Sequence, residues 1–274
     1  MPTPTTEQSV QADQPSHAHH NPHVPHAPHA LSKAQLLYVW LMAISIACLI
    51  MADLLGVKLF RIPLGFSFTL PWLSTPIDAI QHTCGMLTFP LTFLITDLAN
   101  EYYGKKAARR IVYISFAMGG ISFVAMNVAL AMPHWNVGFN IDAKSFIDVF
   151  GNSRVMFVAS LAAYLIGNLA DVYMFGFIKR RTGGRLIWLR ATGSTVISQF
   201  VDSFVVTYIA FNLGRKYFPA GTDPMPFMEV IKTAGTGYTL KFVIALGITP
   251  LIYLGRFLIE KQLGLKPISS SSIT

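Results

Sequence analysis

Six long runs of apolar residues constrain the fold of this chain more than any other feature. A membrane-spanning helix needs about 20 predominantly apolar residues, with a usual range of about 17 to 25. Runs of this kind occupy residues 36–52, 79–96, 111–132, 155–178, 191–213 and 233–259. Hydrophobic residues make up 53% of the 274 residues and charged residues only 12%, which argues against a water-soluble globular protein. We therefore expect an all-α polytopic membrane protein with six transmembrane helices.

The segments outside these runs differ from them in composition. Residues 1–33 contain six of the eight histidines, interleaved with prolines, at His17, His19, His20, His23, His26 and His29. This composition predicts a disordered cytoplasmic tail, and loose binding of a transition metal is the alternative. Residues 62–77 are uncharged but proline-rich, which favours a re-entrant or surface-lying segment over a helix. The expected organisation is the tail 1–33, a membrane domain 34–262 and a short cytoplasmic tail 263–274.

The basic residues predict the orientation of the helices. Two loops between predicted helices are strongly basic, with Lys105, Lys106, Arg109 and Arg110 in one and Lys179, Arg180, Arg181, Arg185 and Arg190 in the other. The positive-inside rule puts both loops in the cytoplasm, and six helices then put both termini there as well. The net charge of +8 is explained by this topology, so it does not indicate nucleic-acid binding.

Polar residues inside the apolar runs are the main functional signal. A charged side chain at the bilayer centre costs about 3 kcal/mol, so it usually faces a cavity, a partner or a pathway. Asn168 and Asp171 are three residues apart, as are Gln199 and Asp202, so each pair shares one helix face. We expect these four side chains to converge at one depth as a substrate-binding site. Interhelical hydrogen bonding that only holds the helices together is the alternative.

Two further residues near the expected outer side could take part in gating or coupling. Lys241, in the last apolar run, either snorkels outward or reaches inward and neutralises Asp202. His82 could bind ligand or titrate near neutral pH, or it could be simply a hydrogen-bonded interface histidine.

A second group of polar residues lies where the run 79–96 meets the cytoplasm. It consists of Asp97, Asn100 and Glu101. We interpret these residues as gating or structural, and they could pair with Arg109 and Arg110.

Three separated segments carry a pattern that is specific enough to compare with a known family. They read FPLTFLITDLANEYYGKKAARR (89–110), AYLIGNLADVYMFGFIKRRTGGRLIWLRATGSTVISQFVDS (163–203) and LKFVIALGITPLIY (240–253). These segments resemble the queuosine precursor transporter family, also called the vitamin uptake transporters. The resemblance implies a six-helix protein of the cell inner membrane. It would import 7-deazaguanine bases such as preQ0 or preQ1, the precursors of the modified tRNA nucleoside queuosine.

The predicted site suits such a substrate. A 7-deazaguanine base has hydrogen-bond donors and an acceptor along one edge, which carboxylate and amide side chains can match. The expected partners are therefore this small molecule and the lipid bilayer, with a homodimer left open, and no nucleic acid, cofactor or metal is expected.

Two other classes of protein are less consistent with the sequence. A substrate-binding component of an ATP-driven importer would leave the ATPase to another chain, and no GxxxxGK[ST] motif is present here. An intramembrane enzyme would need catalytic residues at suitable spacing, but the runs contain neither HExxH nor GxSxG. We expect a transporter and not an enzyme, driven either by protons carried on Asp202 or Asp171 or by facilitated diffusion.

Overall fold

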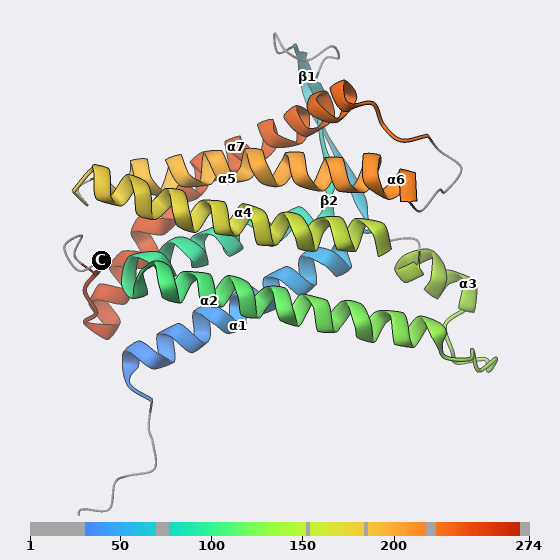
Figure 1. The fold of residues 1–274 in the computed structure, drawn as a ribbon, viewed down its shortest axis with the longest axis horizontal. Helices are drawn as coiled ribbons and strands as arrows, with labels where there is room; N and C mark the ends of the chain where they lie inside the picture. Colours follow the sequence, from blue (N-terminus) through green and yellow to red (C-terminus); the bar gives the residue numbers. More distant parts are fainter. Residues whose placement is uncertain (1–30, 70–76, 152–153, 184–185, 218–222, 269–274) are drawn as a thin grey trace, which may run out of the picture. The chain divides into compact units, whose positions relative to one another are not determined.

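The computed structural model describes residues 31–69, 77–151, 154–183, 186–217 and 223–268. The predicted tail 1–33 and the end of the C-terminal tail lie almost entirely outside these residues. The helices are α1 (Lys33–Leu55), α2 (Phe89–Ala131), α3 (Ala143–Phe146), α4 (Arg154–Arg181), α5 (Ile187–Tyr208), α6 (Gly214–Tyr217) and α7 (Phe227–Leu263) (Figure 1). A 3-10 turn (Cys84–Leu87) precedes α2, and π-helical turns (Ile147–Gly151 and Ile209–Leu213) follow α3 and α5.

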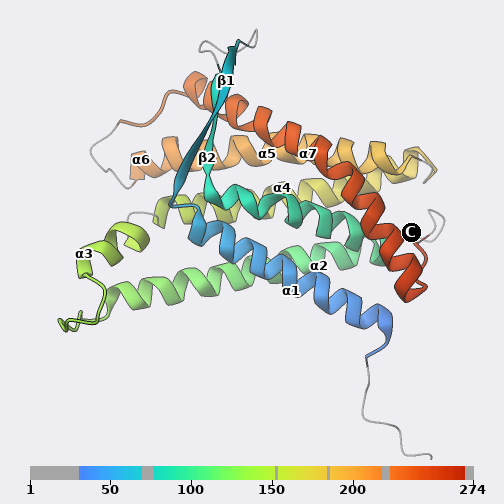
Figure 2. The same cartoon turned by 180° about the vertical axis from the view of Figure 1, so that it is seen from behind.

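Helix α2 is two helices joined at a sharp bend. Gly104 has φ 78° and ψ 174°, a left-handed backbone conformation that favours glycine. The chain reverses direction there, so the arm before Gly104 and the arm after it run in opposite directions (Figures 1 and 2). Five of the six predicted apolar runs are therefore helical over most of their length. The run 111–132 forms most of the second arm of α2, and the run 79–96 contributes only residues 89–96 to the first arm.

Four helical segments in the described part of the chain are long and apolar enough to cross a membrane. They are Lys33–Leu55, Cys84–Ala131, Ala143–Arg181 and Thr192–Tyr217. The second has 48 residues and contains the bend at Gly104. Length and composition thus support a helical membrane protein. Among the described residues, helix α7 (Phe227–Leu263) is not one of these four segments.

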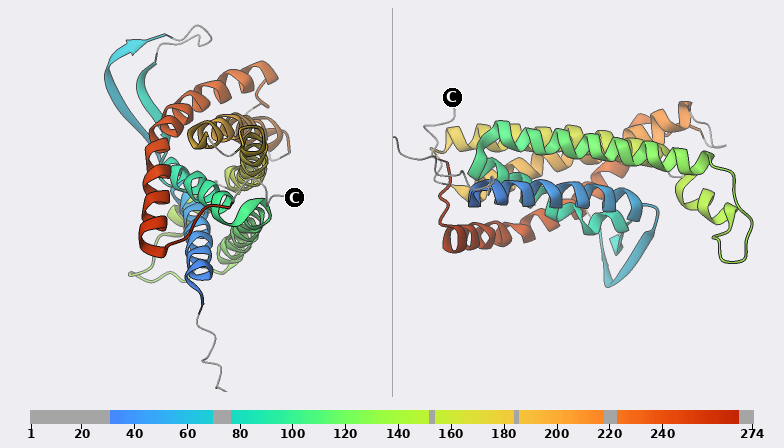
Figure 3. Two further views of the ribbon diagram at one scale, coloured as in Figure 1. Left: turned by 90° about the vertical axis from the view of Figure 1, so that its left-hand side faces the viewer. Right: turned by 90° about the horizontal axis from the view of Figure 1, so that it is seen from below.

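One predicted helix begins later than expected, because its first residues form a strand. Strand β1 (Leu59–Phe68) pairs antiparallel with β2 (Ile77–Thr83), and Arg61 forms an ion pair with Asp78 at 2.7 Å. The prediction of a re-entrant or surface-lying segment at 62–77 missed this hairpin, which projects from the helices (Figure 3). A two-stranded hairpin has only edge strands, so it tolerates Pro63 within β1. Pro90 then lies in the first turn of α2, where proline is favourable.

The main hydrophobic core lies between α1, α2 and α4. Its buried members include Leu49, Ile111, Val112, Phe157 and Val172. Helix α4 also packs along α5, and α5 packs against α7. Many large apolar side chains on the outer helix faces are exposed, as expected for surfaces that contact lipid.

Candidate functional site

Two of the four predicted substrate-binding residues, Asp171 and Asp202, lie where α4 and α5 meet. A Cβ added to Gly167 would lie 3.0 Å from the Cβ of Asp202, so the two helices approach closely at that level. One turn along α4, the Ser198 hydroxyl donates to Oδ1 of Asp171 at 3.3 Å. Asn168, Asp171 and Gln199 are buried, and the side chain of Asp202 is only 16% exposed. We call Asn168, Asp171, Gln199 and Asp202 the polar layer.

Two members of the polar layer carry buried polar atoms without hydrogen-bond partners. Gln199 is 0% exposed, and neither its Nε2 nor its Oε1 is hydrogen-bonded within the described part of the chain. Oδ2 of Asp171 and the hydroxyl of Ser203 are in the same situation. An unsatisfied buried polar group costs about 1–3 kcal/mol, so the fold retains these groups at the expense of stability. Unpaired donors and acceptors at one interface are what a polar ligand would satisfy.

The first arm of α2 adds polar residues on the other side of α4. Thr96 donates to Oδ1 of Asn168 at 3.2 Å, and Nδ2 of Asn100 donates to the Val172 carbonyl at 3.1 Å. Asp97 is 2% exposed on the same arm. The predicted residues of this arm therefore lie beside α4, in the interior of the helices.

Lys241 reaches inward from α7. Its ammonium forms an ion pair with Oδ2 of Asp202, and it lies 5.6 Å from the centroid of the Phe89 ring. Of the two alternatives for this lysine, the structure shows the one in which it neutralises Asp202. This pair ties α5 to α7 at the level of the polar layer.

His82 lies at the end of β2, close to this ion pair. Burial lowers the pKa of His82 from 6.5 to about 4, and the positive charge of Lys241 adds to the effect. Its Nδ1 accepts a hydrogen bond from the backbone N–H of Thr83 at 2.9 Å. Of the two alternatives for His82, the hydrogen bond and the burial favour the hydrogen-bonded histidine.

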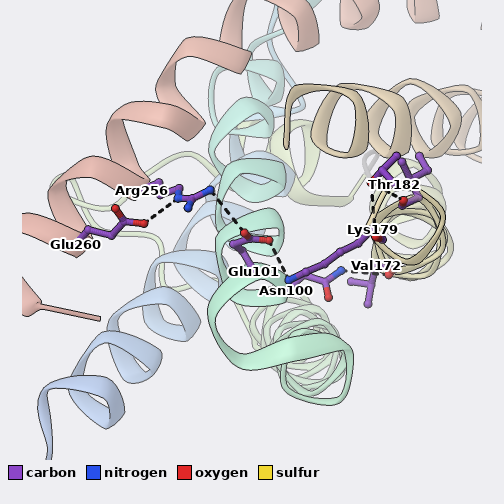
Figure 4. Close-up of polar contacts among 8 residues, drawn as sticks. Asn100, Glu101, Val172, Lys179, Thr182, Arg256 and Glu260 are labelled. Atoms are coloured by element: carbon purple, nitrogen blue, oxygen red, sulfur yellow. Dashed lines mark hydrogen bonds and ion pairs between the residues drawn. The ribbon is translucent and has the colours of Figure 1, made fainter. Parts of the chain in front are cut away.

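A second cluster of charges joins three helices near the bend in α2. Oε2 of Glu101 lies 3.1 Å from Nζ of Lys179, and Oε1 lies 3.9 Å from Arg256 (Figure 4). Arg256 also pairs with Glu260 at 2.8 Å, and the backbone carbonyl of Glu101 accepts from the N–H of Ile268 at 3.0 Å. We call Glu101, Lys179, Arg256 and Glu260 the Glu101 network.

The Glu101 network differs from the pairing that the sequence suggested. Glu101 lies before the bend at Gly104 and faces α4 and α7. Arg109 lies after the bend and donates to the Tyr173 hydroxyl at 2.9 Å. From its sequence Lys179 is predicted only to lie in a basic cytoplasmic loop, although this side chain is 2% exposed. No sequence signal distinguished it from the exposed basic residues beside it.

Residues able to hold a metal are not gathered in the described part of the chain, where no group of three His, Cys, Asp or Glu side chains lies close enough. What the interior offers instead is amide and carboxylate hydrogen bonding beside a neutralised ion pair. This chemistry suits an uncharged or weakly charged polar organic molecule.

Comparisons with known proteins identify the family. The family model described as "Putative vitamin uptake transporter" matches residues 83–255, which is more than half of the chain. The chain belongs to the vitamin uptake transporter family. The matched residues include the polar layer, Lys241 and the first arm of α2.

Three relatives of this chain are bacterial proteins that are named as queuosine precursor transporters. The "Probable queuosine precursor transporter" of Bacillus subtilis is 31% identical over 185 residues, which cover 67% of this chain and 75% of the relative. Its namesake in Haemophilus influenzae is 31% identical over 152 residues, 55% of this chain and 61% of the relative. The "Queuosine precursor transporter" of Escherichia coli is 30% identical over 139 residues, 51% of this chain and 59% of the relative. No solved structure gives a significant match.

Family and structure agree on the location of the protein. A transporter family and several apolar helices of membrane-spanning length make this a multi-pass protein of the cell inner membrane.

Proposed function

We propose that this protein imports queuosine precursors, 7-deazaguanine bases, across the inner membrane. Family membership and the names of three relatives support this function. The observation that carries the proposal is the wholly buried amide of Gln199, whose nitrogen and oxygen both lack hydrogen-bond partners within the described residues. The comparisons give no support to a component of an ATP-driven importer.

The chemistry of the polar layer fits the edge of such a base. Oδ2 of Asp171 can accept from a ring N–H or an exocyclic amine, and the amide of Gln199 can both donate and accept. Asn168 and Asp202 already have partners, so we assign them to shaping the site and setting its charge. Satisfying the unpaired groups only when the base is bound would give binding energy and selectivity together.

We also propose six membrane crossings with both termini in the cytoplasm. The two arms of α2 run in opposite directions, and α7 exposes Val243, Leu254 and Phe257 as a lipid-facing helix would (Figure 1). The bend at Gly104 and the end of α4 lie on one side of the helices and carry the basic residues. Single cysteines at Lys106 and at Trp135, which follows the far end of α2, test this topology in a chain whose Cys48 and Cys84 are replaced by alanine. An impermeant thiol reagent applied to intact cells should label only the cysteine at 135.

Transport by the purified protein is the direct test of function. Liposomes containing only this chain should show saturable uptake of radiolabelled 7-cyano- or 7-aminomethyl-7-deazaguanine, and adenine should not compete. Asp171→Ala should lose most of the uptake, whereas Asp223→Ala, which removes an exposed acid outside the polar layer, should keep it. Uptake equal to that of empty liposomes would refute the function.

The same liposomes decide how transport is driven. We propose that protons drive accumulation, because the polar layer contains two acids in the interior of the helices. An imposed inward proton gradient should then give a transient overshoot of substrate above equilibrium. Equilibration without an overshoot would mean facilitated diffusion, with the acids acting only as ligands.

A further inference from the structure

Two basic side chains contact one tyrosine beside the bend in α2, and a third lies near one of them. Nζ of Lys105 lies 3.6 Å from the centroid of the Tyr173 ring, and Nη1 of Arg109 donates to the Tyr173 hydroxyl at 2.9 Å. The stem of Lys105 runs along α4, where a Cβ added to Gly176 would lie 3.9 Å from its Cδ. Arg180, one turn further along α4, is close enough to repel the Lys105 ammonium. We call Lys105, Arg109, Tyr173 and Arg180 the basic–aromatic cluster.

Within the described part of the chain, no ion pair balances the charges of this cluster. Among the described residues, no acidic side chain forms an ion pair with Lys105, Arg109 or Arg180. The Nε–H of Arg109 is buried and also lacks an acceptor within the described part of the chain. Like charges held together in this way repel one another unless an anion lies between them. In contrast, the buried ammonium groups of Lys179 and Lys241 each form an ion pair with a carboxylate.

The cluster lies on an outer face of the helices. Tyr173 is 42% exposed and Phe177, one turn along α4, is 43% exposed. The guanidinium of Arg181 lies 5.2 Å from the centroid of the Phe177 ring. In the opposite direction, two turns before Tyr173, the exposed face of α4 is apolar and carries Ile166, which is 44% exposed. Aromatic and basic residues followed by apolar ones are typical of the level where lipid headgroups meet acyl chains.

We propose that the basic–aromatic cluster binds the phosphate of an anionic phospholipid. Arginine side chains donate paired hydrogen bonds to phosphate oxygens, and the lysine adds a point charge. The apolar surface of α4 beyond Tyr173 is placed to contact the acyl chains, which a free phosphate ion would not use. The lipid would join the second arm of α2 to α4 at the bend. This role is separate from substrate binding in the polar layer.

The test compares lipids on the intact protein purified in detergent. Dioleoylphosphatidylglycerol should raise the melting temperature and remain bound in native mass spectra, while dioleoylphosphatidylcholine and inorganic phosphate should do neither. Lys105→Gln combined with Arg109→Gln should weaken phosphatidylglycerol binding at least fivefold. Lys106→Gln combined with Arg110→Gln removes the same amount of charge from exposed positions on the same arm of α2. This variant should bind phosphatidylglycerol like the unchanged protein.

A third variant keeps all the charges and so protects the test against misfolding. Tyr173→Leu removes only the ring and hydroxyl that hold Lys105 and Arg109 in place, and it should weaken phosphatidylglycerol binding two- to fivefold. Equal losses in both double variants would show nonspecific attraction to loop charge and overturn the proposal. If inorganic phosphate raised the melting temperature as much as phosphatidylglycerol, the proposal would be overturned in favour of a free-anion site. If phosphatidylcholine bound as tightly as phosphatidylglycerol, the charge of the headgroup would not matter and the proposal would also be overturned.

Discussion

Replacing Gln199 by leucine should make this protein more stable and unable to transport. The side chain is 0% exposed and both ends of its amide lack hydrogen-bond partners within the described residues. Leucine has a similar size and no polar atoms, so the change removes two unsatisfied groups without opening a large cavity. If the amide serves to bind substrate, the free energy of unfolding should rise in this variant while transport is lost.

The magnitude follows from the two unsatisfied groups. Each costs about 1–3 kcal/mol, so leucine should raise the free energy of unfolding by about 2 kcal/mol at the low end of the range. For a protein of this size, 1 kcal/mol corresponds to a shift of roughly 2–4 °C. We therefore expect the melting temperature of Gln199→Leu in detergent to rise by roughly 4–8 °C.

The assay combines melting with ligand binding and uptake. A precursor at about 100 times its dissociation constant should stabilise the unchanged protein by about 2.7 kcal/mol. The same concentration should leave the melting temperature of Gln199→Leu unchanged, and uptake should fall at least tenfold. Gln262→Leu makes the same substitution at an exposed position near the end of α7 and should alter neither property.

Two results would refute this reasoning. A lower melting temperature for Gln199→Leu would mean that the amide stabilises the fold through contacts that leucine cannot replace. Undiminished uptake with unchanged ligand stabilisation would mean that the buried amide does not contact the substrate.

Three further predictions concern close packing, pH and buried charge. Gly167→Ala places a Cβ 3.0 Å from a side-chain atom of α5, so it should reduce uptake and lower the free energy of unfolding by about 1–3 kcal/mol. Gly120→Ala is the control, because a Cβ there has no atom within 4 Å, and it should be neutral or slightly stabilising in thermal melts. Because the pKa of His82 is lowered to about 4 in the fold, the unfolded chain binds the extra proton between pH 6.5 and 4. The free energy of unfolding should therefore fall by up to about 3 kcal/mol across that range, and His82→Gln should flatten the melting profile. Glu101→Gln removes the carboxylate 3.1 Å from Lys179, which is 2% exposed, and should lower the free energy of unfolding by about 3 kcal/mol. Adding Lys179→Met removes the unpaired buried charge, so the double variant should regain most of that free energy.

The sequence predicted the helices well because hydropathy and length determine them directly. Five of the six apolar runs form a helix over most of their length, and α1 begins at the capping box formed by Ser32 and Gln35. Hydropathy does not distinguish a strand from a helix in a short apolar stretch, so residues 79–83 were assigned to a helix although they pair with β1. The reversal at Gly104 was expected only as a loop.

The polar layer could be anticipated because spacing determines which side of a helix a residue occupies. The spacing of Asn168 and Asp171 and of Gln199 and Asp202 predicts that each pair shares one face. Asp171 and Asp202 each contact the facing helix, whereas Asn168 accepts a hydrogen bond from Thr96 of α2. The Glu101 network could not be found in this way. Glu101 and Lys179 are 78 residues apart, and only the packing of α2 on α4 brings them into contact.

The two sets of buried charges divide the work of holding the helices together. Asp202 and Lys241 join α5 to α7 beside the polar layer, while Glu101 joins α2 to α4 and α7 near the bend. A buried ion pair adds little net stability because desolvating both charges offsets their attraction, but breaking one is costly. Pairs of this kind therefore favour discrete helix arrangements over gradual ones. Helix α7 takes part in both sets, through Lys241 and Arg256, and so connects the polar layer to the bend in α2.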